Sequence, residues 1–304
     1  MKRITTIICL LALVPVATAA WFTNSVSVDS FVRAAAPGSN YGGAGALAVA
    51  GANAVNASGV ANGPFDTFIR FNTAALVANF NSLFGPDQWA VNAANLRVTE
   101  LGAPNNALFN RGIGAFEIRW IANDSWTEGS GNPTTPATTG ITYHDEPALL
   151  QAGPDISLGA FTNAGVDGAL SFSLALPRAF TADVAEGGEV GLFLTALDAA
   201  VGFTFDSRSF GTAAARPYLE ISAVPKPIIT AIARSGPDVV ITAANGLAGG
   251  AYYVLNSATL ALPLSRWTRV ATNAPAADGV FTLTVMNASG LGSGPVQFYT
   301  LETK

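Results

Sequence analysis

The sequence predicts an all-β protein whose short antiparallel strands form a sandwich or a barrel. Apolar and polar residues alternate along many short runs, which is the period of a strand with one buried face. In one such run Phe116, Ile118 and Trp120 share a face. Glu117 and Arg119 lie on the opposite face of the same run. Glycine, proline, asparagine and aspartate separate the runs, as is typical of turns between strands.

The composition sets the size and the broad class of the protein. The chain has 304 residues, of which 50% are hydrophobic, so it is long enough for two domains with substantial cores. Only 12% of the residues are charged and the formal net charge is −5, which argues against binding to nucleic acid or to an anionic membrane surface. With one histidine and one cysteine, zinc-finger and disulfide scaffolds are excluded.

Residues 1–20 are expected to be a signal peptide. A basic start (Met1–Arg3) precedes an apolar run over 4–16, and Ala17-Thr18-Ala19 matches a cleavage site. The apolar run is shorter than the roughly 20 residues that span a bilayer, although a retained N-terminal anchor is the alternative. We therefore expect a secreted, extracellular or cell-surface protein with no transmembrane segment after the signal is removed. Cys9 leaves with the signal, so the exported chain is expected to be free of cysteine.

The first domain is expected to hold most of the strands, with two interruptions. A helix is predicted over 73–84, because Leu76, Phe80, Leu83 and Phe84 share helical spacing and Thr73 can cap the helix. The segment 129–140 has no apolar anchor and is predicted to be a mobile surface loop. The strands are expected at 27–33, 65–71, 95–101, 115–121, 169–176, 189–197, 202–205 and 217–222.

A second domain is expected after residue 222. Residues 223–227 contain two prolines and are typical of a stiff linker. New alternating runs start at 228–233, 238–242, 252–255, 280–285 and 296–301, so residues 228–304 are predicted to be a smaller all-β domain.

Several fragments follow one another in a fixed order along residues 21–222. They are DSFVR (29–33), SNYG (39–42), FIRF (68–71), ANLRV (94–98), DSWTE (124–128), GITY (140–143), FDSRS (205–209) and RPYLEI (216–221). This series resembles the DNRLRE domain, an exported β-sandwich related to the disaggregatase module and to alginate-type carbohydrate-binding modules. The resemblance implies an antiparallel, jelly-roll-like β-sandwich that binds polysaccharide. The fragments YYVLNS (252–257), WTRV (267–270), GVFTL (279–283) and QFYTL (297–301) resemble a small β-sandwich domain appended to many exported bacterial proteins.

Aromatic and arginine side chains from these fragments are the candidate ligand-binding residues. Trp126 and Glu128 can form a platform on which a sugar stacks, or Trp126 can instead close one end of the core. Arginines bind the carboxylates of acidic polysaccharides bidentately, or they pair internally with Asp29, Asp66, Asp206 and Glu117. The full candidate set is Arg33, Tyr41, Arg70, Arg119, Trp126, Glu128, Tyr143 and Arg208.

Catalytic arrangements are poorly supported by the sequence. Ser207 and His144 are the only serine–histidine pair suggested by a motif, and the chain has no nucleophile elbow. The acid pairs Asp124/Glu128 and Asp145/Glu146 are of a kind found in any chain with twenty acidic residues. No cofactor is expected; a structural Ca²⁺ is chemically compatible with an exported β protein, but no ligands for it can be named.

The sequence therefore favours a non-catalytic exported protein that binds extracellular polysaccharide or mediates cell-surface adhesion. The first alternative is a structural subunit of a matrix, sheath or surface layer that binds copies of itself. The low charge and the mean hydropathy of +0.37 suit that alternative. The second alternative is a polysaccharide-degrading enzyme.

Overall fold

The computed structural model describes residues 19–56, 58–101, 108, 111–151, 153–288 and 297–303. Residues 1–18, which hold most of the expected signal peptide, lie outside the described residues. The prediction of a protein built mostly from antiparallel strands is confirmed, with 47% strand and 12% helix. The chain divides into two compact units, Ala20–Ala223 and a C-terminal unit that begins at Val224. No helix in the part of the chain that is described has the length and apolar character needed to span a membrane.

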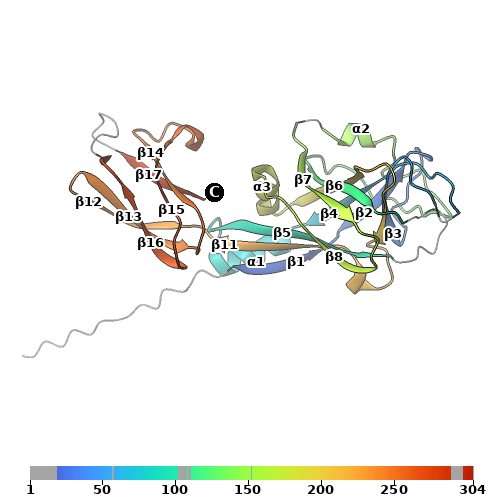
Figure 1. The fold of residues 1–304 in the computed structure, drawn as a ribbon, viewed down its shortest axis with the longest axis horizontal. Helices are drawn as coiled ribbons and strands as arrows, with labels where there is room; N and C mark the ends of the chain where they lie inside the picture. Colours follow the sequence, from blue (N-terminus) through green and yellow to red (C-terminus); the bar gives the residue numbers. More distant parts are fainter. Residues whose placement is uncertain are drawn as a thin grey trace, which may run out of the picture. The chain divides into compact units, whose positions relative to one another are not determined.

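The first unit is built on one 11-stranded antiparallel sheet (Figure 1). The strand order is β1-β11-β5-β10-β3-β4-β9-β6-β7, while β2 pairs with β4 and β8 pairs with β5. The strands are β1 (Ala20–Ser25), β2 (Val28–Arg33), β3 (Ala46–Ala50), β4 (Phe65–Asn72), β5 (Trp89–Glu100), β6 (Gly114–Ile121), β7 (Ile156–Asn163), β8 (Gly168–Ser173), β9 (Glu189–Ala196), β10 (Gly202–Asp206) and β11 (Tyr218–Pro225).

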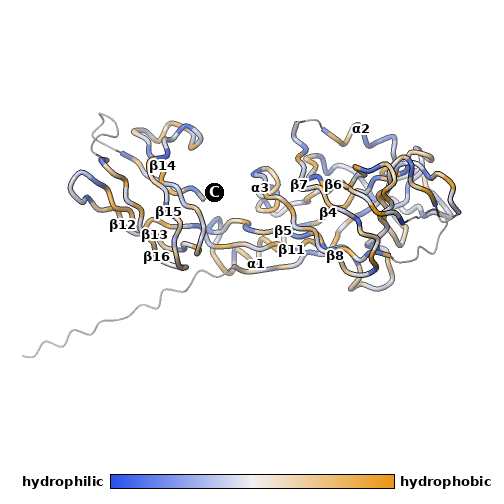
Figure 2. Tube along the Cα trace, in the orientation of Figure 1, coloured by the Kyte–Doolittle hydropathy of each residue, from blue (hydrophilic) through white to orange (hydrophobic). Residues whose placement is uncertain are grey.

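The large sheet curls around its main core. Phe116 of β6 lies 4.9 Å from Phe203 of β10 and 5.3 Å from Phe172 of β8, measured between ring centroids. Strand β6 is separated from β10 by three other strands in the sheet order, so these rings meet across the core and not within one sheet face. Hydrophobic and hydrophilic residues alternate along the strands (Figure 2), so each strand turns an apolar face toward the core.

Helices close the edges of this core. The helix predicted over 73–84 is confirmed as α1 (Ala74–Phe84), with Leu76 and Phe80 buried. Thr73 stands at the predicted N-cap position, but its hydroxyl makes no capping hydrogen bond and instead contacts the carbonyl oxygens of Val184 and Gly188. Leu83, expected on the buried face of the helix, is 56% exposed. The remaining helices of this unit are α2 (Glu146–Leu149), α3 (Arg178–Glu186) and the 3₁₀ turn η1 (Ala213–Ala215).

The C-terminal unit consists of two three-stranded antiparallel sheets around a core of its own. The first sheet has the order β12 (Ile228–Ser235), β13 (Asp238–Gly246), β16 (Gly279–Val285). The second has the order β15 (Thr268–Asn273), β14 (Tyr252–Ser257), β17 (Phe298–Thr303), and the 3₁₀ turn η2 spans Leu264–Arg266. Strand β11 runs to Pro225, so residues 223–225 of the expected linker are part of a strand.

Candidate functional site

Strand β4 is buried on both faces, and its second face carries the site. Because side chains alternate along a strand, Phe65, Ile69 and Phe71 point into the main core. Phe68 points to the opposite face, and so do its second neighbours Asp66 and Arg70. A central strand with polar residues on a covered face needs internal partners for those residues.

The segment from 122 to 150 covers this second face and forms a small apolar cluster with it. We call this the second apolar cluster. Trp126 is its largest side chain, is 5% exposed, and lies 5.8 Å from Phe68 between ring centroids. The cluster consists of Val32, Phe68, Ile121, Trp126, Ile141, Leu149 and Phe193, with Val28, Tyr143 and Leu150 packed against it.

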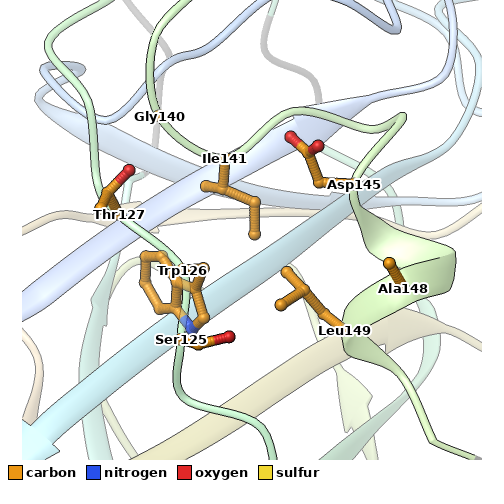
Figure 3. A pocket seen from close by; sticks show the side chains of 8 residues that line it. All are labelled: Ser125, Trp126, Thr127, Gly140, Ile141, Asp145, Ala148 and Leu149. Atoms are coloured by element: carbon orange, nitrogen blue, oxygen red, sulfur yellow. The ribbon is translucent and has the colours of Figure 1, made fainter.

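A pocket of about 330 Å³ lies within this segment, between residues 125–127 and α2. Figure 3 shows the side chains of Trp126, Ile141 and Leu149 around a common space, with Thr127 and Asp145 at its edge. Ser125, Gly140 and Ala148 complete the lining. We call this space the Trp126 pocket. It combines an apolar wall with two hydroxyl groups and one carboxylate.

Arg70 fixes the position of Trp126. Its guanidinium lies 5.0 Å from the centroid of the Trp126 ring. Its Nη1 donates to the backbone oxygens of Trp126, at 3.0 Å, and Asp124. Its Nε lies 3.2 Å from a carboxylate oxygen of Glu189. Arg70 is therefore held by an ion pair and two hydrogen bonds from Nη1, and its guanidinium lies over one face of the indole.

Two carboxyl groups meet beside the second apolar cluster. Asp66, from β4, accepts hydrogen bonds from the side chains of Thr195 and Glu146. Burial raises the pKa of both acids, and the proximity of the Asp66 charge raises the pKa of Glu146 further. The hydrogen bond between them lowers the pKa of Asp66 and raises the pKa of Glu146. Glu146 is therefore the protonated partner, and its carboxyl O–H donates a hydrogen bond to Asp66. This bond ties the start of α2 to the sheet.

A second polar centre surrounds Glu128, and we call it the Glu128 network. Glu128 receives a bidentate pair of hydrogen bonds from Arg208 and one, at 3.1 Å, from the backbone N–H of Asp29. The N–H of Arg208 donates in turn to Asp29 Oδ2 at 2.6 Å. The side-chain amide of Asn40 donates to the carbonyl oxygens of Glu128 and Ile141. A Cβ atom at Gly42 would lie 2.0 Å from the carbonyl oxygen of Glu128, so only glycine fits there.

The structure brings some of the candidate residues together and separates others. Arg70 contacts Trp126, Arg208 pairs with Glu128, and Tyr143 packs against the second apolar cluster. Arg33, Arg119 and Tyr41 are placed differently. The guanidinium of Arg33 donates to Asn62 at 2.7 Å and lies 5.5 Å from the Phe65 ring centroid.

Arg119 and Tyr41 also have internal partners. Arg119 lies 3.8 Å from the Glu117 carboxylate and donates to the carbonyl oxygen of Asp155. Tyr41 is 2% exposed and stacks on Phe31 with ring centroids 4.5 Å apart. Internal pairing was the alternative for the arginines, and Glu117 is one of the expected partners. Glu128 and Glu189 were not expected as partners, because each lies far from its arginine in the sequence. Ligand binding by this set stays a prediction.

The residues considered for catalysis have structural contacts. Ser207 is buried and its hydroxyl donates to the carbonyl oxygen of Ala44, while His144 is exposed in a loop. Asp145 accepts two hydrogen bonds from Thr142, and Glu146 is engaged with Asp66. Among the described residues, no group of three or more histidine, cysteine, aspartate or glutamate side chains is arranged to hold a metal ion.

Comparison with known proteins does not identify a family, so the function is inferred from the geometry of the site. No family model matches the chain, and a search of curated proteins also finds no match. Fold and site together define a mostly β protein with two units, one of which carries a small amphipathic pocket over its large sheet.

Proposed function

We propose that this chain is an exported, non-catalytic protein whose first unit binds extracellular polysaccharide or mediates adhesion at the cell surface. In this proposal residues 21–222 form a jelly-roll-like β-sandwich of the DNRLRE kind, and residues 228–304 form a second, smaller β-sandwich. The Glu128 network supports the resemblance, because its four members come from four of the ordered fragments and meet in space.

The observation that carries the proposal is the composition of the Trp126 pocket. A sugar ring has apolar C–H faces and a rim of hydroxyl groups. The pocket offers it an apolar wall in Trp126, Ile141 and Leu149, and polar groups in Thr127 and Asp145. Its volume of about 330 Å³ is at the small end of ligand sites, which suits one sugar unit of a longer chain.

Affinity electrophoresis tests this proposal. The full chain is run through native gels that contain alginate, polygalacturonate, yeast mannan, dextran or laminarin, with a gel free of polysaccharide as reference. We expect retarded migration in at least one polysaccharide. Unchanged migration in every gel would contradict the proposed binding. If the chain also released reducing ends from any of these polymers, an enzymatic function would be the better explanation.

A second function, self-association in an extracellular layer, is favoured by one edge strand of the C-terminal unit. Strand β12 lies at the end of its sheet and exposes Ile228 and Ile232, at 45% and 53%. An exposed edge strand with apolar side chains pairs readily with another chain. Light scattering at increasing concentration tests this function. Growth of the mean mass that Ile232→Lys abolishes would support it, and a constant monomer mass would exclude it.

A further inference from the structure

From the charges around the Trp126 pocket, we infer that it takes an uncharged sugar ring and rejects the uronate units of acidic polysaccharides. This inference rests on the proposed function and specifies its ligand. It differs from the expectation based on arginines, because that expectation requires guanidinium groups that are free to meet a carboxylate.

Among the described residues that line the pocket, Asp145 is the only ionisable one, and none of them is a lysine, arginine or histidine. Asp145 uses Oδ2 to accept hydrogen bonds from the backbone N–H and the hydroxyl of Thr142, which holds the carboxylate at the rim. A carboxylate in this position accepts hydrogen bonds from sugar hydroxyls, and it repels a uronate carboxylate.

The cation that contacts Trp126 is Arg70 of β4, which does not line the pocket and whose side chain is only 15% exposed. Its charge is met by Glu189, and its Nη1 donates to the backbone oxygens of Asp124 and Trp126. Arg70 therefore cannot turn to meet an anionic ligand without leaving three partners.

The wall of the pocket opposite Trp126 is α2. It contributes Ala148 and Leu149 to the lining, and its first residue, Glu146, is bonded to Asp66. This pair adds negative charge beside the pocket and no positive charge. The electrostatic surroundings therefore disfavour an anion from α2 as well as from the rim.

Titration calorimetry with mannan, laminarin, alginate and polygalacturonate tests the inference on the full chain. We expect binding to a neutral polymer and at least about tenfold weaker binding to both uronates. Ala148 is exposed on α2, so Ala148→Trp fills the pocket without disturbing the core and is expected to weaken neutral binding at least about tenfold. Ala185→Trp is the matched control, because Ala185 is also exposed on a helix and does not line the pocket.

The outcomes separate this inference from the proposed function. Binding to uronates alone, or tighter binding to the cationic polymer chitosan than to any neutral one, would overturn the inference and leave polysaccharide binding intact. If Ala148→Trp left the affinity for neutral polymers unchanged, the ligand would bind outside the Trp126 pocket. That result would also overturn the inference and leave polysaccharide binding intact. Binding to none of the polymers would overturn both.

Discussion

At the scale of single residues, Glu128 holds together parts of the chain that are far apart in sequence. Its carboxylate is 16% exposed and accepts from Asp29, about a hundred residues upstream, and from Arg208, eighty residues downstream. A buried carboxylate with charge-assisted, bidentate partners contributes more than an exposed ion pair. Removing the Glu128 carboxylate leaves the donors of Asp29 and Arg208 without this acceptor.

We therefore predict that Glu128→Ala lowers the free energy of unfolding of the first unit by about 2–4 kcal/mol. Glu117→Ala is the matched control, since Glu117 is similarly buried but has Arg119 as its ion-pair partner at 3.8 Å. Its cost is expected to stay below about 1 kcal/mol. Equilibrium urea denaturation followed by far-UV circular dichroism measures both. Equal losses in the two variants would show that the Glu128 network adds nothing beyond a simple ion pair.

At the scale of elements, Asn40 attaches the segment 129–140 to the sheet. This segment lacks apolar anchors, yet Gly131 donates its N–H to Asn40 Oδ1 and the amide of Asn40 donates to Glu128 and Ile141 at the two ends of the loop. Asn40 is fully buried. Its amide therefore replaces the missing hydrophobic contacts with directional hydrogen bonds.

Asn40→Asp is predicted to destabilise the first unit by about 2–4 kcal/mol, because a carboxylate cannot donate to the two carbonyl oxygens. Asn132→Asp provides the comparison within the same loop. The side-chain oxygen of Asn132 only accepts, from Thr134 and Thr135, and an aspartate keeps those bonds. We expect a change within about 0.5 kcal/mol there. Thermal unfolding and protease sensitivity of the loop report on both variants, and equal behaviour of the two would refute the role given to Asn40.

The same elements show what the sequence can and cannot predict. Strands with one buried face, such as β5 and β6, follow from their alternation, and α1 follows from its helical spacing. Strand β3 could not be predicted in this way, because all five of its residues are buried and its sequence therefore does not alternate between apolar and polar residues. The partners of Arg70 and Arg208 could not be predicted either. Pairing across a sheet depends on the order of the strands, and the alternation of residues along one strand says nothing about that order.

At the scale of the whole molecule, the first unit buries several carboxyl groups that lack a full counter-charge. Burial raises the pKa of Asp29 to about 7, against a lowering by its hydrogen bond from Arg208. Burial likewise raises the pKa of Asp124 to about 7 and that of Asp206 to about 6. These groups lie in β2, in the covering segment and in β10, so their effect is distributed over the unit.

The stability of the first unit is therefore predicted to fall as the pH rises from about 5 to 8. A carboxyl whose folded pKa exceeds its unfolded value binds more protons in the folded state, so its contribution is complete below about pH 4 and is lost as the pH passes through the folded pKa. Each fully titrating group contributes a slope of at most about 1.4 kcal/mol per pH unit. Denaturant midpoints measured across this range test the prediction. Asp29→Asn mimics the protonated acid and is expected to flatten the curve, whereas Asp87→Asn, at an exposed turn, is expected to leave it unchanged. If the stability of the wild-type protein instead rose from pH 5 to 8, the prediction would be wrong. These acids would then be ionised in the folded protein and stabilised there by positive charges.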